Sequence, residues 1–318
     1  MPRSSTGRSS TPPEALGESE PTPTRCGYVA LIGAPNVGKS TLLNRLVGRK
    51  LAIVTPKAQT TRARLLGIAI EGATQIIYVD TPGIFAPRRR LDRAMVAAAW
   101  AGAEDADETV LLVDASRGID GDTRRILDRL ADRARRWILA LNKIDRVRRQ
   151  SLLALADRLS REGSFDPVFM ISALTGDGID DLERYVAANL PPGPWLFPED
   201  QLSTAPERLI AAEVTREQVF LQLHDELPYA STVETERWQD RPDGSVRIEQ
   251  VIYVQRPGQR AIVLGEGGQR IKAIGARARA DLERMLDRRV HLFLFVKVRE
   301  HWGDDPERFA ALGLDYEA

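Results

Sequence analysis

A glycine-rich stretch near the start of the chain has the residue types and spacing to hold a polyphosphate. Its members, with the threonine that follows, are Gly33, Ala34, Pro35, Asn36, Val37, Gly38, Lys39, Ser40 and Thr41. In the pattern G-x-x-x-x-G-K-[ST], the glycines let backbone N–H groups turn toward phosphate oxygens, and the helix that follows favours negative charge. The lysine reaches the outer phosphates, and the hydroxyl of Ser40 can bind Mg²⁺. The sequence therefore predicts a phosphate-binding loop.

Two segments downstream have the residues to complete a site for Mg²⁺ and a terminal phosphate. The first closes an apolar run and consists of Asp80, Thr81, Pro82 and Gly83, followed by Ile84. An acidic residue at a strand end can bind Mg²⁺, and a following glycine can bring its N–H close to a phosphate. The second, 51–62, is polar and contains Thr60 and Thr61, and nucleotide-gated switches supply a threonine from such a loop. The alternative for Asp80 is a plain strand-to-loop turn.

Two short patterns further along could bind a purine base. They are Asn142, Lys143, Ile144 and Asp145, and then Ser172, Ala173 and Leu174. A carboxylate at Asp145 can accept two N–H bonds from guanine, whereas adenine lacks this donor pair and would leave the carboxylate unpaired. The alternative is a helix N-cap, where Asn and Asp are favoured. Because the patterns come after the phosphate loop and the D-x-x-G sequence, guanine binding is favoured.

The elements that must position these residues alternate between strands and helices. Apolar runs predict strands at 28–32, 64–70, 74–80, 109–113, 137–141 and 168–171, with helices at 41–47, 91–101, 123–131 and 152–159. Such alternation predicts an α/β fold, with a doubly wound, mostly parallel sheet covered by helices on both faces. Ligands of these sheets bind at the carboxyl ends of the strands, which is where the polar patterns stand.

The chain changes character after a proline-rich linker at 190–198. The predicted elements are helices at 207–223, 259–264 and 269–286 and strands at 231–238, 247–255 and 290–298, in the order α-β-β-α-α-β. Gly265, Glu266, Gly267 and Gly268 form a G-x-x-G turn, and Arg270, Lys272 and Arg277 follow. Two such glycines let a nucleic-acid backbone approach the main chain. Residues 256–299 hold eleven Lys/Arg against four Asp/Glu, which favours RNA over the alternative of a solvated arginine face.

Composition adds limits but little about partners. The 318 residues suit two domains, and the 45 Lys/Arg balance the 45 Asp/Glu. The single cysteine, Cys26, excludes a disulfide framework and suits a reducing cytoplasm; packing at a strand start is expected for it. No apolar run approaches the roughly 20 residues of a membrane helix, so we expect no membrane span. The Ser/Pro-rich N-terminus reads as a disordered tail.

The five motifs of the first half resemble the signature motifs of small GTP-binding proteins, and the second half resembles a type II KH domain, which is an α+β fold. Together, over about residues 25–303, the chain resembles the Era family of bacterial ribosome-assembly GTPases. The resemblance includes 226–229 and 296–302. The resulting division is a tail at 1–24, a GTPase domain at 25–190, a linker at 191–206, a KH domain at 207–302 and a C-terminal tail at 303–318.

The resemblance implies GTP hydrolysis to GDP with Mg²⁺. Lys39, Thr61, Asp80 and Gly83 would be the catalytic set, with Ser40, Thr61 and Asp80 at the metal. Thr61 is expected there rather than Thr60 because it directly precedes Arg62, as in related motifs. All residues of the motifs named above except Thr60 and Thr61 would contact GTP. The partners implied are the 3′ region of 16S ribosomal RNA and the 30S subunit, whose assembly and rRNA maturation the protein would assist. A monomer in the cytoplasm with peripheral inner-membrane contact is expected.

Two departures from the family pattern and one match bear on function. Ile84 stands where Ras-like proteins place the glutamine that orients water, which implies slow basal turnover. Asn36 matches a position that binds K⁺ in several relatives, so K⁺ is a further expected cofactor. Glu266 replaces a usually positive residue of the G-x-x-G turn. Two alternative functions follow: a nucleotide-gated RNA-binding module with little turnover, and a membrane-peripheral cell-cycle regulator.

Overall fold

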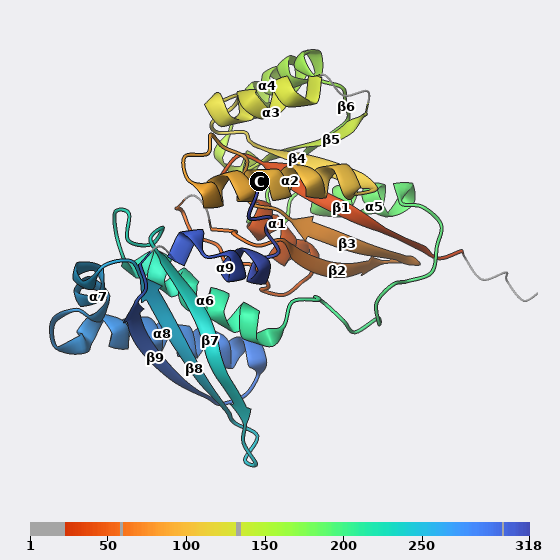
Figure 1. Ribbon diagram of the computed structural model, residues 1–318. Helices are drawn as coiled ribbons and strands as arrows, with labels where there is room; N and C mark the ends of the chain where they lie inside the picture. The colour runs from red at the N-terminus through yellow and green to blue at the C-terminus, as the bar shows by residue number, and fades with distance from the viewer. Residues whose placement is uncertain (1–22, 58–59, 132–134, 301) are drawn as a thin grey trace, which may run out of the picture.

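The computed structural model describes residues 23–57, 60–131, 135–300 and 302–318, which form two folded units joined by a linker (Figure 1). The expected N-terminal tail lies almost wholly outside the described residues. The first unit is built on a six-stranded sheet and the second on a three-stranded sheet. This arrangement confirms the predicted fold class, an α/β domain followed by an α+β domain.

The large sheet places the carboxyl ends of five parallel strands at one edge of the first unit. Its strands are β1 (Arg25–Gly33), β2 (Leu65–Glu71), β3 (Thr74–Asp80), β4 (Glu108–Asp114), β5 (Trp137–Asn142) and β6 (Phe165–Met170). They are ordered β2-β3-β1-β4-β5-β6, and only the β2–β3 pair is antiparallel. The central strands are buried on both faces, which explains why they are continuous apolar runs. The predicted sixth strand starts three residues late because Pro167 interrupts its pattern, and an edge strand tolerates proline.

Helices flank the large sheet. They are α1 (Lys39–Leu46), α2 (Arg90–Asp105), α3 (Gly121–Ala131), α4 (Arg149–Glu162) and α5 (Ile179–Asn189), with a short 3₁₀ turn, η1 (Ile144–Arg146). Helix α5 is not among the elements predicted from the sequence. Its apolar residues Ile179, Leu182 and Val186 form one buried face. Asp180 and Asp181 in the first turn interact favourably with the positive end of the helix dipole.

The second domain follows the predicted order α-β-β-α-α-β. Its elements are α6 (Glu207–Gln222), β7 (Ser231–Asp240), β8 (Val246–Val254), α7 (Pro257–Leu264), η2 (Glu266–Gly268), α8 (Gln269–Leu286) and β9 (Val290–Val298). The sheet order is β7-β8-β9, with β8 and β9 parallel. Helices α6 and α8 bury Val219, Ile274 and Leu282 in the core of this domain. The order of elements is that of a type II KH domain.

The last residues are not a tail, contrary to the expectation for 303–318. They form η3 (Trp302–Asp304) and α9 (Pro306–Ala311), and α9 packs against α2 of the GTPase domain (Figure 1). Phe309 and Leu314 are buried together with Ala94 and Met95 of α2. A six-residue helix is too short to be stable alone, so this segment depends on α2 as a partner.

The linker is fixed to the edge of the large sheet rather than hanging free. Gln75 of β3 accepts hydrogen bonds from the backbone N–H groups of Leu196 and Phe197, at 2.9 and 3.0 Å. In β2, the N–H of Ile68 donates to the carbonyl of Leu202 at 2.9 Å. The sheet therefore sets where α6 begins.

Candidate nucleotide site and nucleic-acid interface

The phosphate loop joins β1 to α1 with a backbone that only glycine allows at its two ends. Gly33 and Gly38 have φ angles of 150° and 105°. A Cβ on Gly33 would lie 2.5 Å from the carbonyl oxygen of Leu112, and one on Gly38 would lie 2.3 Å from Nδ2 of Asn142. The loop is thus pressed against the ends of β4 and β5, which leaves its other side for a ligand.

Lys39 lies inside the loop and is only 6% exposed. Its Nζ donates to the carbonyl oxygens of Gly33 and Ala34, both at 3.1 Å. Burial lowers the pKa of Lys39 from 10.5 to about 8, although the charge of Asp80 opposes the shift. A buried cation held only by carbonyl oxygens is suited to exchange these weak partners for a phosphate.

Three side chains predicted to bind Mg²⁺ meet beside the loop. Ser40 Oγ lies 2.9 Å from Thr61 Oγ1 and donates to Asp80 Oδ2 at 2.8 Å, while Thr61 Oγ1 donates to the same carboxylate oxygen at 3.2 Å. Burial raises the pKa of Asp80, against the lowering effects of Lys39 and the two hydroxyls. Among the described residues, Asp80 Oδ1 is buried and without a hydrogen-bond partner. Thr60, in contrast, contributes its carbonyl oxygen to Arg216.

The segment after Asp80 packs against the phosphate loop. A Cβ on Gly83 would come within 3.0 Å of Pro35, and the N–H of Ile84 donates to the carbonyl of Gly33 at 3.0 Å. The Ile84 side chain is buried in the main core, and Thr81 donates its hydroxyl to the carbonyl of Leu31. These side chains hold the segment in place, and the apolar side chain of Ile84 cannot bind water.

Asn142 connects the phosphate loop to the two base-binding patterns. Its Nδ2 donates to the carbonyl of Val37 at 2.7 Å, and its Oδ1 accepts from the N–H of Ala173 at 2.9 Å. Ser172 donates its hydroxyl to Asp145 Oδ1 at 2.6 Å, which leaves the other carboxylate oxygen for a ligand. The sequence alone does not reveal this bridging role of Asn142.

Lys143 adds a second connection. It donates from Nζ to the carbonyl of Asn36 and to Asp114 Oδ2, both at 2.6 Å. Asp114 ends β4 and is not among the site residues predicted from the sequence. Its position as an acidic residue at a strand end, similar to that of Asp80, is the signal that could have identified it.

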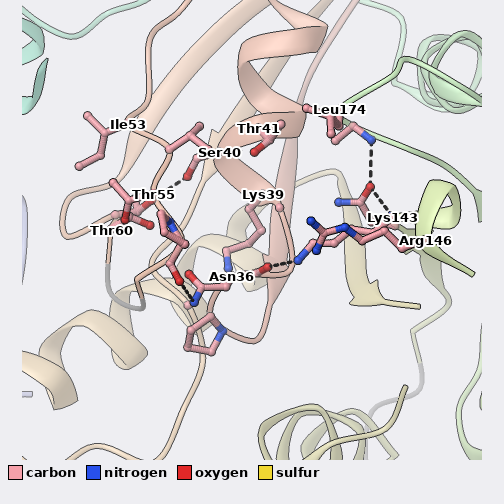
Figure 2. Close-up of a pocket in the computed structure, with 18 of the residues that line it drawn as sticks. Asn36, Lys39, Ser40, Thr41, Ile53, Thr55, Thr60, Lys143, Arg146 and Leu174 are labelled. Atoms are coloured by element: carbon pink, nitrogen blue, oxygen red, sulfur yellow. Dashed lines mark hydrogen bonds between the residues drawn. The ribbon is translucent and has the colours of Figure 1, made fainter. Parts of the chain in front are cut away.

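A cavity of about 390 Å³ joins these groups. Its lining residues are Pro35, Asn36, Gly38, Lys39, Ser40, Thr41, Ile53, Val54, Thr55, Pro56, Thr60, Thr61, Gly83, Asn142, Lys143, Asp145, Arg146, Ala173 and Leu174. Figure 2 shows Lys39 between two groups, with Thr55 and Thr60 on one side and Lys143, Arg146 and Leu174 on the other. The predicted residues outside this lining are Gly33, Ala34, Val37, Asp80, Thr81, Pro82, Ile84, Ile144 and Ser172.

Four lining residues at 53–56, together with Thr60 and Arg146, are absent from the residues predicted for the site. The segment 51–62 is predicted as a switch loop, but its sequence does not indicate which of its apolar members face the ligand. Arg146 directly follows Asp145, and this adjacency is the only signal that the sequence carries for it. The site therefore brings together all five predicted motifs and adds residues 53–56 of the switch loop.

The G-x-x-G turn of the second domain is open on its outer side. Gly265, Gly267 and Gly268 have φ angles of 71°, 56° and 77°. A Cβ on Gly267 or Gly268 would meet nothing within 4 Å, so a ligand backbone can approach the main chain there. Arg270, Lys272 and Arg277 of α8 are exposed, as is Glu266.

Comparison with known proteins gives matches over both domains. The family model described as "50S ribosome-binding GTPase" matches residues 28–143, and the KH domain model matches 226–303. GTPase Era of Rhizobium meliloti (strain 1021) is 60% identical over 294 residues, covering 92% of this chain and 94% of the relative. GTPase Era of Brucella suis biovar 1 (strain 1330) is 58% identical over 302 residues, covering 95% of this chain and 97% of the relative.

Two solved structures are also similar over most of the chain. One is Era in complex with MgGDPNP and nucleotides 1506–1542 of 16S ribosomal RNA, and the other is an Era variant of Aquifex aeolicus bound to GDP.AlF4-. Each has a TM-score of 0.86 and 38% identity, covering 91% of this chain and 99% of the other. With relatives this similar over nearly their whole length, and with both domains in the same order, the chain belongs to the Era family of GTPases.

Proposed function

We propose that this chain is a GTP-hydrolysing switch that binds the 3′ region of 16S ribosomal RNA through its KH domain and assists 30S assembly and rRNA maturation. The proposal rests on one observation: the side chains of Ser40, Thr61 and Asp80 lie within hydrogen-bond distance of one another beside the phosphate loop. This arrangement supplies the groups for a metal–triphosphate site, and Asn142 joins that site to the base-binding residues. The RNA partner is inferred from the family to which the chain belongs.

Mg²⁺ fits the residues present. Ser40 and Thr61 would hold the ion together with Asp80, whose buried Oδ1 has no hydrogen-bond partner among the described residues and could be satisfied by a cation. When bound, Mg²⁺ would supply positive charge that neutralises the negative charge developing on the phosphates. Lys39 adds a positive charge at the outer phosphates, and the N–H groups of the loop fix their position.

Guanine is selected by the pair of segments that Asn142 and Ser172 hold together. Asp145 has one carboxylate oxygen fixed by Ser172, so its plane is set before a base arrives. Such preorganisation lets the carboxylate accept two N–H donors of guanine and reject a base that lacks them. Replacement of Asp145 by asparagine should move the preference from GTP toward xanthosine triphosphate.

We propose that K⁺ assists hydrolysis in place of the glutamine that Ras-like proteins have at the position of Ile84. Asn36 Oδ1 is buried and has no hydrogen-bond partner among the described residues, whereas its Nδ2 is fixed to the carbonyl of Pro56 at 3.0 Å. A carbonyl-type oxygen oriented in this way suits a monovalent cation next to the phosphates. Hydrolysis rates measured in K⁺ and in Na⁺ test this assignment, and equal rates would contradict it.

The experiment that tests the proposed function measures GTP hydrolysis with and without an oligonucleotide of the 16S rRNA 3′ end. We expect phosphate release that the RNA accelerates, and a shift to xanthosine triphosphate in Asp145→Asn. A folded protein that neither hydrolyses GTP nor binds the oligonucleotide would contradict the proposal.

A second candidate is an RNA-binding module whose nucleotide is hardly turned over. The buried Ile84 favours it, because its side chain cannot orient an attacking water. The same hydrolysis assay separates the two, since the second candidate predicts no acceleration by RNA.

The family resemblance also implies a cytoplasmic protein with peripheral contact to the inner membrane, and we propose both. Among the helices of the described residues, none combines the length and apolarity needed to cross a bilayer. Vesicle co-sedimentation tests the peripheral contact, and binding that disappears with modest salt would identify it as electrostatic.

A further inference from the structure

Arg62 directly follows the proposed metal ligand Thr61, but its side chain enters the KH domain. It is only 4% exposed. Its Nη1 donates to the carbonyl of Ser231 at 2.8 Å, and its Nη2 donates to the carbonyls of Pro228 and Tyr229 at 3.3 and 3.1 Å. One side chain therefore holds the segment that leads into β7.

Two aromatic rings lie close to the same guanidinium group. The Arg62 Cζ atom lies 5.9 Å from the ring centre of Phe220 in α6 and 5.4 Å from that of Trp302 in η3. Trp302 is itself fixed, because its Nε1 donates to the carbonyl of Ala230 at 2.9 Å. Only the planar, multiply donating guanidinium can satisfy rings and carbonyls together, which makes lysine a poor substitute.

The partners of Arg62 among the described residues are carbonyl oxygens and rings, not a carboxylate in ion-pair contact. Burial and the nearby charge of Arg216 lower the pKa of Arg62 to about 9, although the charges of Glu213 and Asp92 oppose the shift. Burying a cation whose direct hydrogen-bond partners are neutral is costly, and replacing buried charges by well-packed apolar side chains is often neutral or stabilising. Stability alone does not account for an arginine at this position.

Helix α6 holds the rest of the switch loop from the same side. Arg216 donates to the carbonyl of Thr60, and Glu217 accepts from the N–H of Val54 at 2.9 Å and pairs with Lys50. The residues on both sides of Thr61 are thus attached to the KH domain. Any displacement of Thr61 must pull on α6 or on the segment before β7.

We propose that Arg62 is the positioning residue through which the nucleotide state reaches the KH domain. While Thr61 holds the metal and the terminal phosphate, Arg62 keeps the 228–231 segment in the arrangement seen here. When hydrolysis removes the phosphate, Thr61 is released, Arg62 loses its position and the start of β7 is freed. This inference rests on the proposed function, because it requires both GTP and RNA binding.

The test compares RNA affinity in two nucleotide states. The anisotropy of a labelled 16S 3′-end oligonucleotide is measured with full-length protein in GDP and in a non-hydrolysable GTP analogue, both with Mg²⁺. In the wild type we expect the two affinities to differ by about 5-fold or more, the usual range of allosteric coupling. In Arg62→Ala the ratio should fall to within about 2-fold of one. Arg64→Ala, an exposed neighbour, should keep the wild-type ratio.

The ratio separates coupling from a general structural defect, because a uniform loss of RNA affinity cancels in it. Titration with a fluorescent GTP analogue and thermal melting establish that each variant is folded and binds nucleotide. If Arg62→Ala does not fold, Arg62→Lys decides, since it keeps the charge but offers its donors from one nitrogen and lacks the planar guanidinium. A wild-type ratio in a folded Arg62 variant overturns the proposal. A ratio of one in wild-type protein that still hydrolyses GTP and binds RNA also overturns it, while the proposed function stands.

Discussion

Replacement of Lys39 by methionine should stabilise the nucleotide-free protein while abolishing GTP binding. Lys39 is buried, and among the described residues its Nζ donates to two carbonyl oxygens at 3.1 Å. The difference between its ordinary pKa of 10.5 and about 8 in the fold corresponds to about 3 kcal/mol of destabilisation of the charged form. Methionine removes the charge at similar volume, so the free energy of unfolding at pH 7 should rise by about 1–3 kcal/mol.

The pH dependence gives a sharper test than the single value. Because the pKa of Lys39 is lowered by folding, the unfolded chain binds more protons than the folded one between about pH 8 and 10.5. The stability of the wild type therefore rises with pH in this window through Lys39, and the advantage of Lys39→Met should shrink from its full value below pH 8 toward zero near pH 10.5.

Urea unfolding in EDTA without nucleotide measures both effects, with Lys272→Met as the control because Lys272 is exposed on α8. The control variant should match the wild type at every pH. A Lys39→Met protein that is no more stable than the wild type at pH 7, or whose advantage grows with pH, would refute the reasoning that burial strains this lysine.

Three further outcomes are expected. Gly38→Ala should weaken GTP binding about 10-fold or more in a fluorescent-nucleotide titration, because the new Cβ would displace Asn142; Gly48→Ala, also at positive φ but in open space, should not. Glu266→Lys should tighten RNA binding and steepen its salt dependence by about one contact, since the turn is exposed; equal salt slopes would contradict this. Phe309→Ala should cost about 3–5 kcal/mol of packing on α2 and expose the C-terminal segment to limited proteolysis.

The nucleotide motifs could be predicted because each is a local pattern with its own strand and helix. Gly33, Lys39 and Asp80 stand where β1, α1 and β3 must place them, and the carboxyl ends of parallel strands meet at one edge. The bridging role of Asn142 could not be predicted, because it depends on which loops adjoin β5 in space.

The contacts between the two domains could not be predicted from the sequence for a similar reason. Arg62 is read as part of a motif next to Thr61, and nothing in its neighbours indicates that Phe220 and Trp302 enclose it. The C-terminal segment was wrongly expected as a tail because α9 is short and takes its stability from Ala94 and Met95, far away in the chain. Contacts between distant segments leave no periodic pattern in either one.

The packing of α9 on α2 means that the polypeptide passes between the two domains twice. The linker fixed by Gln75 is the outward connection, and the chain returns to the GTPase domain at Phe309 and Leu314. When the side-chain contacts at the switch loop are released, a body that the chain attaches at two separate points moves most easily by rotation about the line that joins them. The KH domain is therefore connected through two hinges rather than one flexible tether. A label or fusion placed after Ala318 acts on one of these two hinges.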